Sequence, residues 1–129
     1  MRLFICLLLF MALQGCSASH EVKLNNSPLN LTVRVMADEN LSQFNNIEIL
    51  PGSMEYKAFN SWLSKNRDGW SKEDRKWLSP YLISGKGFSI RFSGDLAVLI
   101  ETRGASQYIL VKDIDGDLVE IFSQYASGR

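Results

Sequence analysis

The first sixteen residues constrain this chain more than any other part of it. Arg2 supplies a basic start, and the eleven residues from Leu3 to Leu13 carry no charge. A helix of that length covers about 16 Å, whereas the hydrocarbon core of a bilayer is about 30 Å thick. A basic start followed by an apolar run too short to span a membrane is typical of an export signal. The sequence therefore predicts a signal peptide over residues 1–15 that is removed and takes no part in the fold.

The end of this run carries a second pattern, Leu13-Gln14-Gly15-Cys16. The quartet resembles the lipobox of bacterial lipoproteins, a family in which the cysteine is acylated and becomes the new N-terminus. Gln14 departs from the family pattern, which more often has a small or aliphatic residue at that position. The alternative is an ordinary secretory signal with Cys16 there by chance, but the Ala-x-Ala-like site that such a signal prefers is poor in this sequence.

The resemblance implies a protein that is lipidated at Cys16, with palmitate-type acyl chains, and held on a membrane of the bacterial cell envelope. Two or three acyl chains make such anchoring stable. In the enteric pattern an aspartate after the cysteine favours retention in the inner membrane, whereas this chain has Ser17. The resemblance therefore implies the outer membrane, with the folded domain facing the periplasm.

Residues 16–20 form a very short tether, so the domain is expected to lie close to the bilayer. The chain has two cysteines, Cys6 in the predicted signal and Cys16. The part that folds, residues 21–129, therefore has no thiol, which excludes a disulfide, a cysteine zinc site and a thiol nucleophile. We expect a single domain that is stabilised by its hydrophobic core alone.

The charges of the chain are balanced, with 14 Lys and Arg against 14 Asp and Glu. No stretch concentrates basic residues as phosphate binding requires, so nucleic acid is not an expected partner. No second apolar run is long enough for a transmembrane helix.

The pattern of apolar residues predicts an α+β fold, with an antiparallel sheet and one main helix packed on one face. The predicted N-terminal strands are Glu21–Leu24, Leu31–Val35 and Ile47–Leu50, and the stretch Asp38–Asn46 is polar. A four-strand meander is expected in the last third of the chain, with Asp115-Gly116 as the turn of its final hairpin. Its strands are Phe88–Phe92, Leu96–Ile100, Tyr108–Val111 and Leu118–Phe122.

The main helix is predicted over Met54–Lys65. Ser53 is a good N-cap, and Glu55 lies in the first turn, where the helix dipole favours a negative charge. One face of this helix is expected to pack inward, because apolar residues recur along it at three- and four-residue spacing. These residues are Tyr56, Phe59, Trp62 and Leu63. A second cap is predicted at Ser71–Asp74, opening a short turn that ends before Pro80.

Two patterns that could carry chemistry are weak. The acids of Asp113–Asp117 alternate as in a calcium loop, but an EF-hand has its glycine at position six and Gly116 is at position four, so a solvated hairpin turn is the better interpretation. The only histidine, His20, lies in the tether, where nothing is expected to fix its geometry. A Ser-His-Asp arrangement is therefore not expected. We predict no cofactor and no catalytic residue, although a pair of carboxylates is left open.

The aromatic segment is the part of the sequence that most suggests a binding site. All three tryptophans lie between Trp62 and Trp77, and Trp and Tyr are frequent anchors for glycans and protein partners. Trp62 is expected in the core, and core is also the alternative for Trp70, which would then cover the end of the sheet. The candidate recognition patch consists of Trp70, Arg75, Lys76, Trp77 and Tyr81.

Three functions are consistent with the sequence. The first is a protein-binding module, either an inhibitor or immunity-type protein with a toxin-type partner or an accessory subunit of an envelope complex. The second is a glycan or small-ligand binder that uses the Trp70–Tyr81 region. The third is a carboxylate-based hydrolase that acts on envelope polymers. Because no catalytic set is recognisable, we expect binding rather than catalysis, and a protein partner first.

Overall fold

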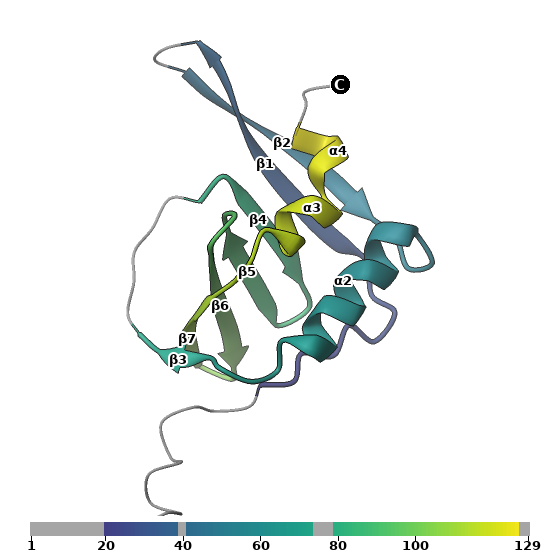
Figure 1. Ribbon diagram of the computed structural model, residues 1–129. Coiled ribbons are helices and arrows are strands. Elements are labelled where there is room, and N and C mark those ends of the chain that lie inside the picture. The colour runs from purple at the N-terminus through teal and green to yellow at the C-terminus, as the bar shows by residue number, and fades with distance from the viewer. Residues whose placement is uncertain (1–19, 39–40, 74–78, 127–129) are drawn as a thin grey trace, which may run out of the picture.

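The computed structural model describes residues 20–38, 41–73 and 79–126, which form a two-layer α+β domain (Figure 1). One layer is a seven-stranded antiparallel sheet in the order β2-β1-β4-β5-β6-β7-β3, and the other is built on one main helix, α2. The predicted fold class is confirmed. The strands are β1 (Leu29–Asp38), β2 (Leu41–Ile49), β3 (Ser71–Lys72), β4 (Tyr81–Gly85), β5 (Phe88–Phe92), β6 (Leu96–Arg103) and β7 (Ser106–Asp113). The helices are α2 (Met54–Lys65), α3 (Asp117–Ile121) and α4 (Ser123–Ala126).

The helix α2 begins and packs as predicted. The Ser53 hydroxyl accepts a hydrogen bond from the backbone N–H of Tyr56 at 3.2 Å, and Asn66 caps the other end. All four residues of the predicted apolar face are buried. Phe59 is fully buried at its centre, with the rings of Trp62 and Phe88 stacked at 6.3 and 6.5 Å. This aromatic cluster joins the helix to the sheet, because ring pairs at such distances stabilise beyond their buried area.

The strand β5 shows which sheet face the helices cover. Phe88, Ile90 and Phe92 are buried in the core cluster, whereas Ser89 and Arg91 between them are only half-buried. Successive side chains of a strand point to opposite faces. The sheet therefore has one face covered by α2 and α3 and a second face, turned away from them, which we call the open face.

The N-terminal part of the sheet differs from the prediction at two places. Glu21–Leu24 is not a strand; Leu24 is 6% exposed and packs in the core without pairing to the sheet. The polar stretch Asp38–Asn46 falls mostly within β2. This strand pairs with β1 in a long hairpin, which begins at the pair formed by Leu29 and Ile49. The outer half of this hairpin projects beyond the helical layer (Figure 1). The side chains of residues 43–46 of β2 are exposed, and this part of the strand has the polar composition expected of a loop.

The C-terminal meander also differs from the prediction. Its four strands are β4 to β7. The first of them, β4, was not predicted, and the strand predicted at the end of the chain is absent from the described residues. Leu118–Phe122 is not a strand, and Asp115-Gly116 does not turn a hairpin but leads into α3. Leu118 and Phe122 are four residues apart and both fully buried, a spacing that fits one face of a helix.

The predicted second cap is wrong in its first half. Ser71 and Lys72 pair with Val111 and Leu110 as the short edge strand β3. The remainder, from Asp74 to the turn before Pro80, lies outside the described residues. Within the described ranges, no helix is both long and apolar enough to cross a membrane.

Candidate functional site

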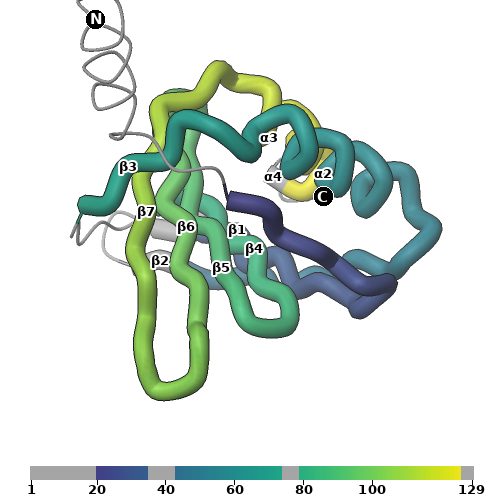
Figure 2. Tube along the Cα trace, turned by 90° about the horizontal axis from the view of Figure 1, so that it is seen from below, coloured from purple at the N-terminus to yellow at the C-terminus, as the bar shows by residue number. Residues whose placement is uncertain are grey.

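The open face of the sheet is a surface that α2, α3 and α4 do not cover. The helices α2, α3 and α4 gather on one side of the sheet (Figure 2). On the opposite side β1 presents Thr32 and Arg34, which pair with Asn46 and Phe44 of β2. The neighbouring strands add Leu82 and Arg91, which pair with each other across β4 and β5. This face therefore combines polar side chains and arginines with an exposed aromatic ring.

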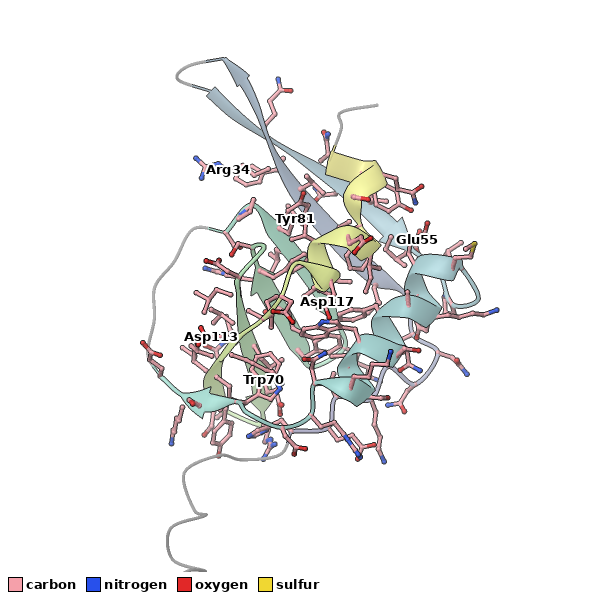
Figure 3. All side chains as sticks on the ribbon, in the orientation of Figure 1. Arg34, Glu55, Trp70, Tyr81, Asp113 and Asp117 are labelled. Atoms are coloured by element: carbon pink, nitrogen blue, oxygen red, sulfur yellow. The ribbon has the colours of Figure 1, made fainter. Side chains whose placement is uncertain are left out.

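A small cavity lies at the centre of this arrangement. Its volume is about 150 Å³. Figure 3 shows Arg34 projecting from β1 on the side away from α2. The backbone N–H of Arg34 donates to the carbonyl of Pro80 at 2.9 Å, which fixes the chain entering β4 against β1. The lining residues are Thr32, Arg34, Phe44, Ser79, Pro80, Leu82 and Arg91.

Phe44 is the most unusual residue of this site. Its side chain is 59% exposed, although large apolar side chains are normally buried. It stands beside Arg34, whose Nε atom is buried without a hydrogen-bond partner among the described residues. Aromatic and arginine side chains supply most of the binding energy in protein interfaces. The pair is therefore suited to recognition of another surface rather than to stability.

Further polar groups lie on the open face beside Phe44, Pro80 and Leu82, the apolar residues of the cavity. The Thr32 hydroxyl donates to Asn46 Oδ1 at 2.8 Å, and both side chains stand on the open face. Next to them lies a shallow hollow of about 550 Å³ on β1, β2 and β4, with Asn30, Glu48 and Ser84 among its lining residues. An apolar centre with hydrogen-bonding groups around it is the usual anatomy of a protein interface.

The strand β2 adds a backbone feature to the same site. It lies at the edge of the sheet and pairs with β1 alone among the described strands. Glu48 is the only charged residue in its nine-residue sequence. Edge strands are normally protected by charges, proline or a covering element, because their unpaired N–H and C=O groups can pair with another chain. This edge carries little such protection.

The sequence-predicted recognition patch is not assembled by the described residues. Trp70 is 2% exposed and packs edge-to-face on Trp62 at 6.4 Å, so its assignment to a surface patch is wrong. Its indole N–H donates to the carbonyl of Asn66 at 2.6 Å. Arg75, Lys76 and Trp77 lie outside the described residues, as does Cys16.

Tyr81 also belongs to the core side of the sheet. Its ring stacks on Phe92 at 5.0 Å with the planes 10° apart, and burial raises the pKa of its phenol. Leu82, the next residue, points to the open face and lines the cavity. Among the described residues of the predicted segment, Ser79 and Pro80 line the site, whereas Trp70 and Tyr81 do not.

The acids of the described chain form no metal cluster. Within residues 20–38, 41–73 and 79–126, no group of three or more His, Cys, Asp or Glu side chains is placed to hold a metal ion. Asp113, Asp115 and Asp117 are exposed around the start of α3, where Asp117 Oδ1 accepts the backbone N–H of Leu118.

The comparisons with known proteins identify no relative. No family model matches this chain, and neither a curated protein nor a solved structure matches it.

Proposed function

We propose that this chain is a bacterial envelope lipoprotein, anchored in the outer membrane through Cys16, that binds a protein partner with the open face of its sheet. The observation that carries the proposal is the exposed Phe44 on the edge strand β2, next to Arg34 of β1. The strand β2 has only one charged residue, Glu48. The partner is either a toxin-type protein that this chain inhibits, or a larger envelope complex in which this chain is an accessory subunit. Binding, rather than catalysis, is the activity proposed.

The size of the cavity favours a protein over a small ligand. Pockets for drug-sized ligands enclose about 300–1,000 Å³ and bury most of the ligand. The cavity beside Phe44 encloses about 150 Å³, which is room for one side chain of a partner. The hollow next to it has a volume of about 550 Å³, within that range, but it is shallow and would leave much of a small ligand in solvent.

The β1–β2 hairpin places this site well for a membrane-held protein. It extends away from the end of the domain at which the described chain begins (Figure 1). A partner strand could add to the free edge of β2, with main-chain hydrogen bonds giving affinity and Phe44 giving specificity. The site then faces the periplasm while the N-terminus stays on the bilayer.

The proposal is tested by affinity capture from detergent-solubilised envelopes. The tagged lipoprotein is compared with Phe44→Ala, with Met54→Ala as the matched control, because Met54 is 84% exposed on α2 and away from the open face. We expect one protein in stoichiometric amount with the wild type and the control, and a loss of at least tenfold with Phe44→Ala. A Trp77→Ala variant tests the predicted segment in the same way.

Anchoring is tested separately with Cys16→Ser. Mass spectrometry of the wild type should show a diacyl or triacyl group on Cys16, and the variant should leave the membrane fraction. Recovery of the same partner by both forms would support a binding site in the folded domain. Equal recovery by wild type and Phe44→Ala would reject the open face as the site.

A further inference from the structure

The last residue of the predicted tether, His20, is held against the domain. The backbone N–H of His20 donates to the carbonyl of Arg67 at 2.7 Å, and its Nδ1 atom lies 3.4 Å from Glu101 Oε1. The expectation that nothing fixes His20 is therefore wrong. The side chains of His20 and Glu101 are only 15% and 13% exposed, so this contact is largely shielded from solvent.

This contact limits how far the domain can stand from its lipid anchor. Three residues separate Cys16 from His20. Four Cα–Cα steps of a fully extended chain span at most about 14 Å. The surface around His20 must therefore lie next to the bilayer whenever Cys16 is acylated. We call it the tether face, and Figure 2 looks toward this end of the molecule.

The tether face carries more exposed cations than exposed acids. Arg103 lies 3.0 Å from Glu101 through its Nη2 atom and is 60% exposed, so its charge still reaches solvent. Lys23 and Lys86 line a hollow of about 140 Å³ together with Glu101 and Glu21. Among the residues that the structure describes, the exposed cations of this face are Lys23, Arg67, Lys72, Lys86 and Arg103, and the acids beside them are the exposed Glu21, Asp68 and Glu73 and the half-buried Glu101.

An exposed tyrosine stands between two of these cations. Tyr108 is 37% exposed, with Lys72 Nζ at 5.9 Å and Arg103 Cζ at 5.1 Å from its ring centre. Tyrosine is enriched at membrane–water interfaces, where its ring sits at the level of the headgroups. Lysine and arginine beside it can keep their apolar stems on the ring while their charges reach phosphate.

Four acids follow the other end of the same hairpin, where no lysine or arginine lies in the segment with them. Leu96 of β6 pairs with Asp113 of β7, while Arg103 pairs with Ser106 at the turn. The seven steps between these ends span about 23 Å. Residues 113–126 contain Asp113, Asp115, Asp117 and Glu120 and no lysine or arginine. A negatively charged surface therefore favours the turn end of this hairpin over the end that carries Asp113.

We propose that the tether face is a second membrane contact, which binds anionic lipid headgroups and holds the domain in one orientation on the bilayer. The inference rests on the proposed anchoring at Cys16, which decides which face meets the membrane. Each lysine or arginine near an anionic surface contributes roughly fivefold in affinity, and salt screens this contribution. The contact is too weak to anchor the protein alone, but it acts on a domain that acylation already holds in place.

The experiment uses the acylated protein on vesicles that contain lipid with a spin label on the headgroup. The mature chain has no thiol besides the modified Cys16, so a new cysteine is a unique labelling site. A fluorophore is placed at Ala105→Cys, in the β6–β7 turn, or at Gln43→Cys, on the outer half of the β1–β2 hairpin; both positions are exposed. We expect at least threefold stronger quenching at position 105 on phosphatidylcholine vesicles that contain about 30% phosphatidylglycerol.

Charge reversal supplies the matched comparison. Lys72→Glu changes the tether face, and Lys57→Glu makes the same change at an exposed position of α2. We expect Lys72→Glu to reduce the difference in quenching between positions 105 and 43 at least twofold on anionic vesicles, and Lys57→Glu to leave it unchanged. Circular dichroism of both variants checks that they are folded.

A form of the protein without acyl chains tests the binding of lipid headgroups independently of anchoring at Cys16. The Cys16→Ser chain is titrated with the same vesicles at low salt, and we expect anionic vesicles to bind at least tenfold more tightly than pure phosphatidylcholine. Attachment of the wild type with equal quenching at both positions would overturn the inference and leave anchoring intact. Equal binding of Cys16→Ser to neutral and anionic vesicles would overturn it whether or not acylation occurs.

Discussion

The ring of Phe122 lies 6.0 Å from that of Phe59 and 6.0 Å from that of Phe92, so it bridges the helical layer and the sheet. Phe122 follows directly after α3, and all three rings are fully buried. The segment that follows β7 thus contributes Phe122 to the core.

We expect Phe122→Ala to destabilise the domain by about 3–5 kcal/mol, because it opens a cavity where three aromatic rings meet. Urea denaturation followed by fluorescence measures the change in the free energy of unfolding. Met54→Ala, at an 84% exposed position, should change it by less than about 0.5 kcal/mol. A similarly small effect for Phe122→Ala would show that the packing of Phe122 does not contribute to the stability of the domain.

The two buried tryptophans should respond differently to the same substitution. The Trp70 indole N–H is bonded to the carbonyl of Asn66, whereas that of Trp62 is buried without a partner among the described residues. Trp70→Phe loses a hydrogen bond and Trp62→Phe loses none, so we expect Trp70→Phe to be more destabilising by about 1 kcal/mol. Thermal unfolding of both variants decides the order, and the reverse order would contradict the assigned bond.

Gly85 has no room for a side chain. A Cβ atom at this position would lie 2.5 Å from Phe88 Cε1 and 2.9 Å from Leu29 Cδ2, whereas one at Gly94 would meet nothing within 4 Å. We expect Gly85→Ala to cost about 1–3 kcal/mol through overpacking and Gly94→Ala to be close to neutral. The denaturation midpoints of the two variants provide the comparison, and equal midpoints would be inconsistent with this packing of β4.

The raised pKa of Tyr81 predicts a loss of stability at alkaline pH. Below about pH 9 the phenol is protonated in both states and contributes nothing to the pH dependence. As the pH rises past 10, the unfolded chain releases this proton before the folded chain does, so the free energy of unfolding falls. Tyr81→Phe should lack this part of the decline. Parallel curves for wild type and variant between pH 9 and 11 would refute the assignment.

Local signals in the sequence were sufficient for elements whose causes are local. The helix α2 follows from the cap at Ser53 and the spacing of its apolar residues, and β5 follows from strict alternation. The segment Leu118–Phe122 fits either a strand or a short helix, and contacts with Phe59 and Phe92 decide between them. The polar residues of β2 do not alternate with apolar residues as a strand usually requires, and they form a strand because they pair with β1.

The candidate site was missed for the same reason. Phe44 is a single aromatic residue in a polar stretch, and nothing in the sequence shows that it pairs with Arg34. Trp70 stands in a polar context, yet it is buried because α2 supplies Trp62 and the carbonyl of Asn66 next to it. Exposure depends on the packing of distant segments, which composition does not record.

The pairing of β1 with β4 joins segments about fifty residues apart, such as Thr32 and Leu82. During synthesis the hairpin of β1 and β2 can form before β4 has left the ribosome. Until β4 pairs with β1, this hairpin has two unpaired edges instead of one. Long-range pairing of this kind slows folding and leaves strands open to other chains in the meantime. A chain that stops before residue 81 is therefore expected to aggregate rather than to persist as a small hairpin domain.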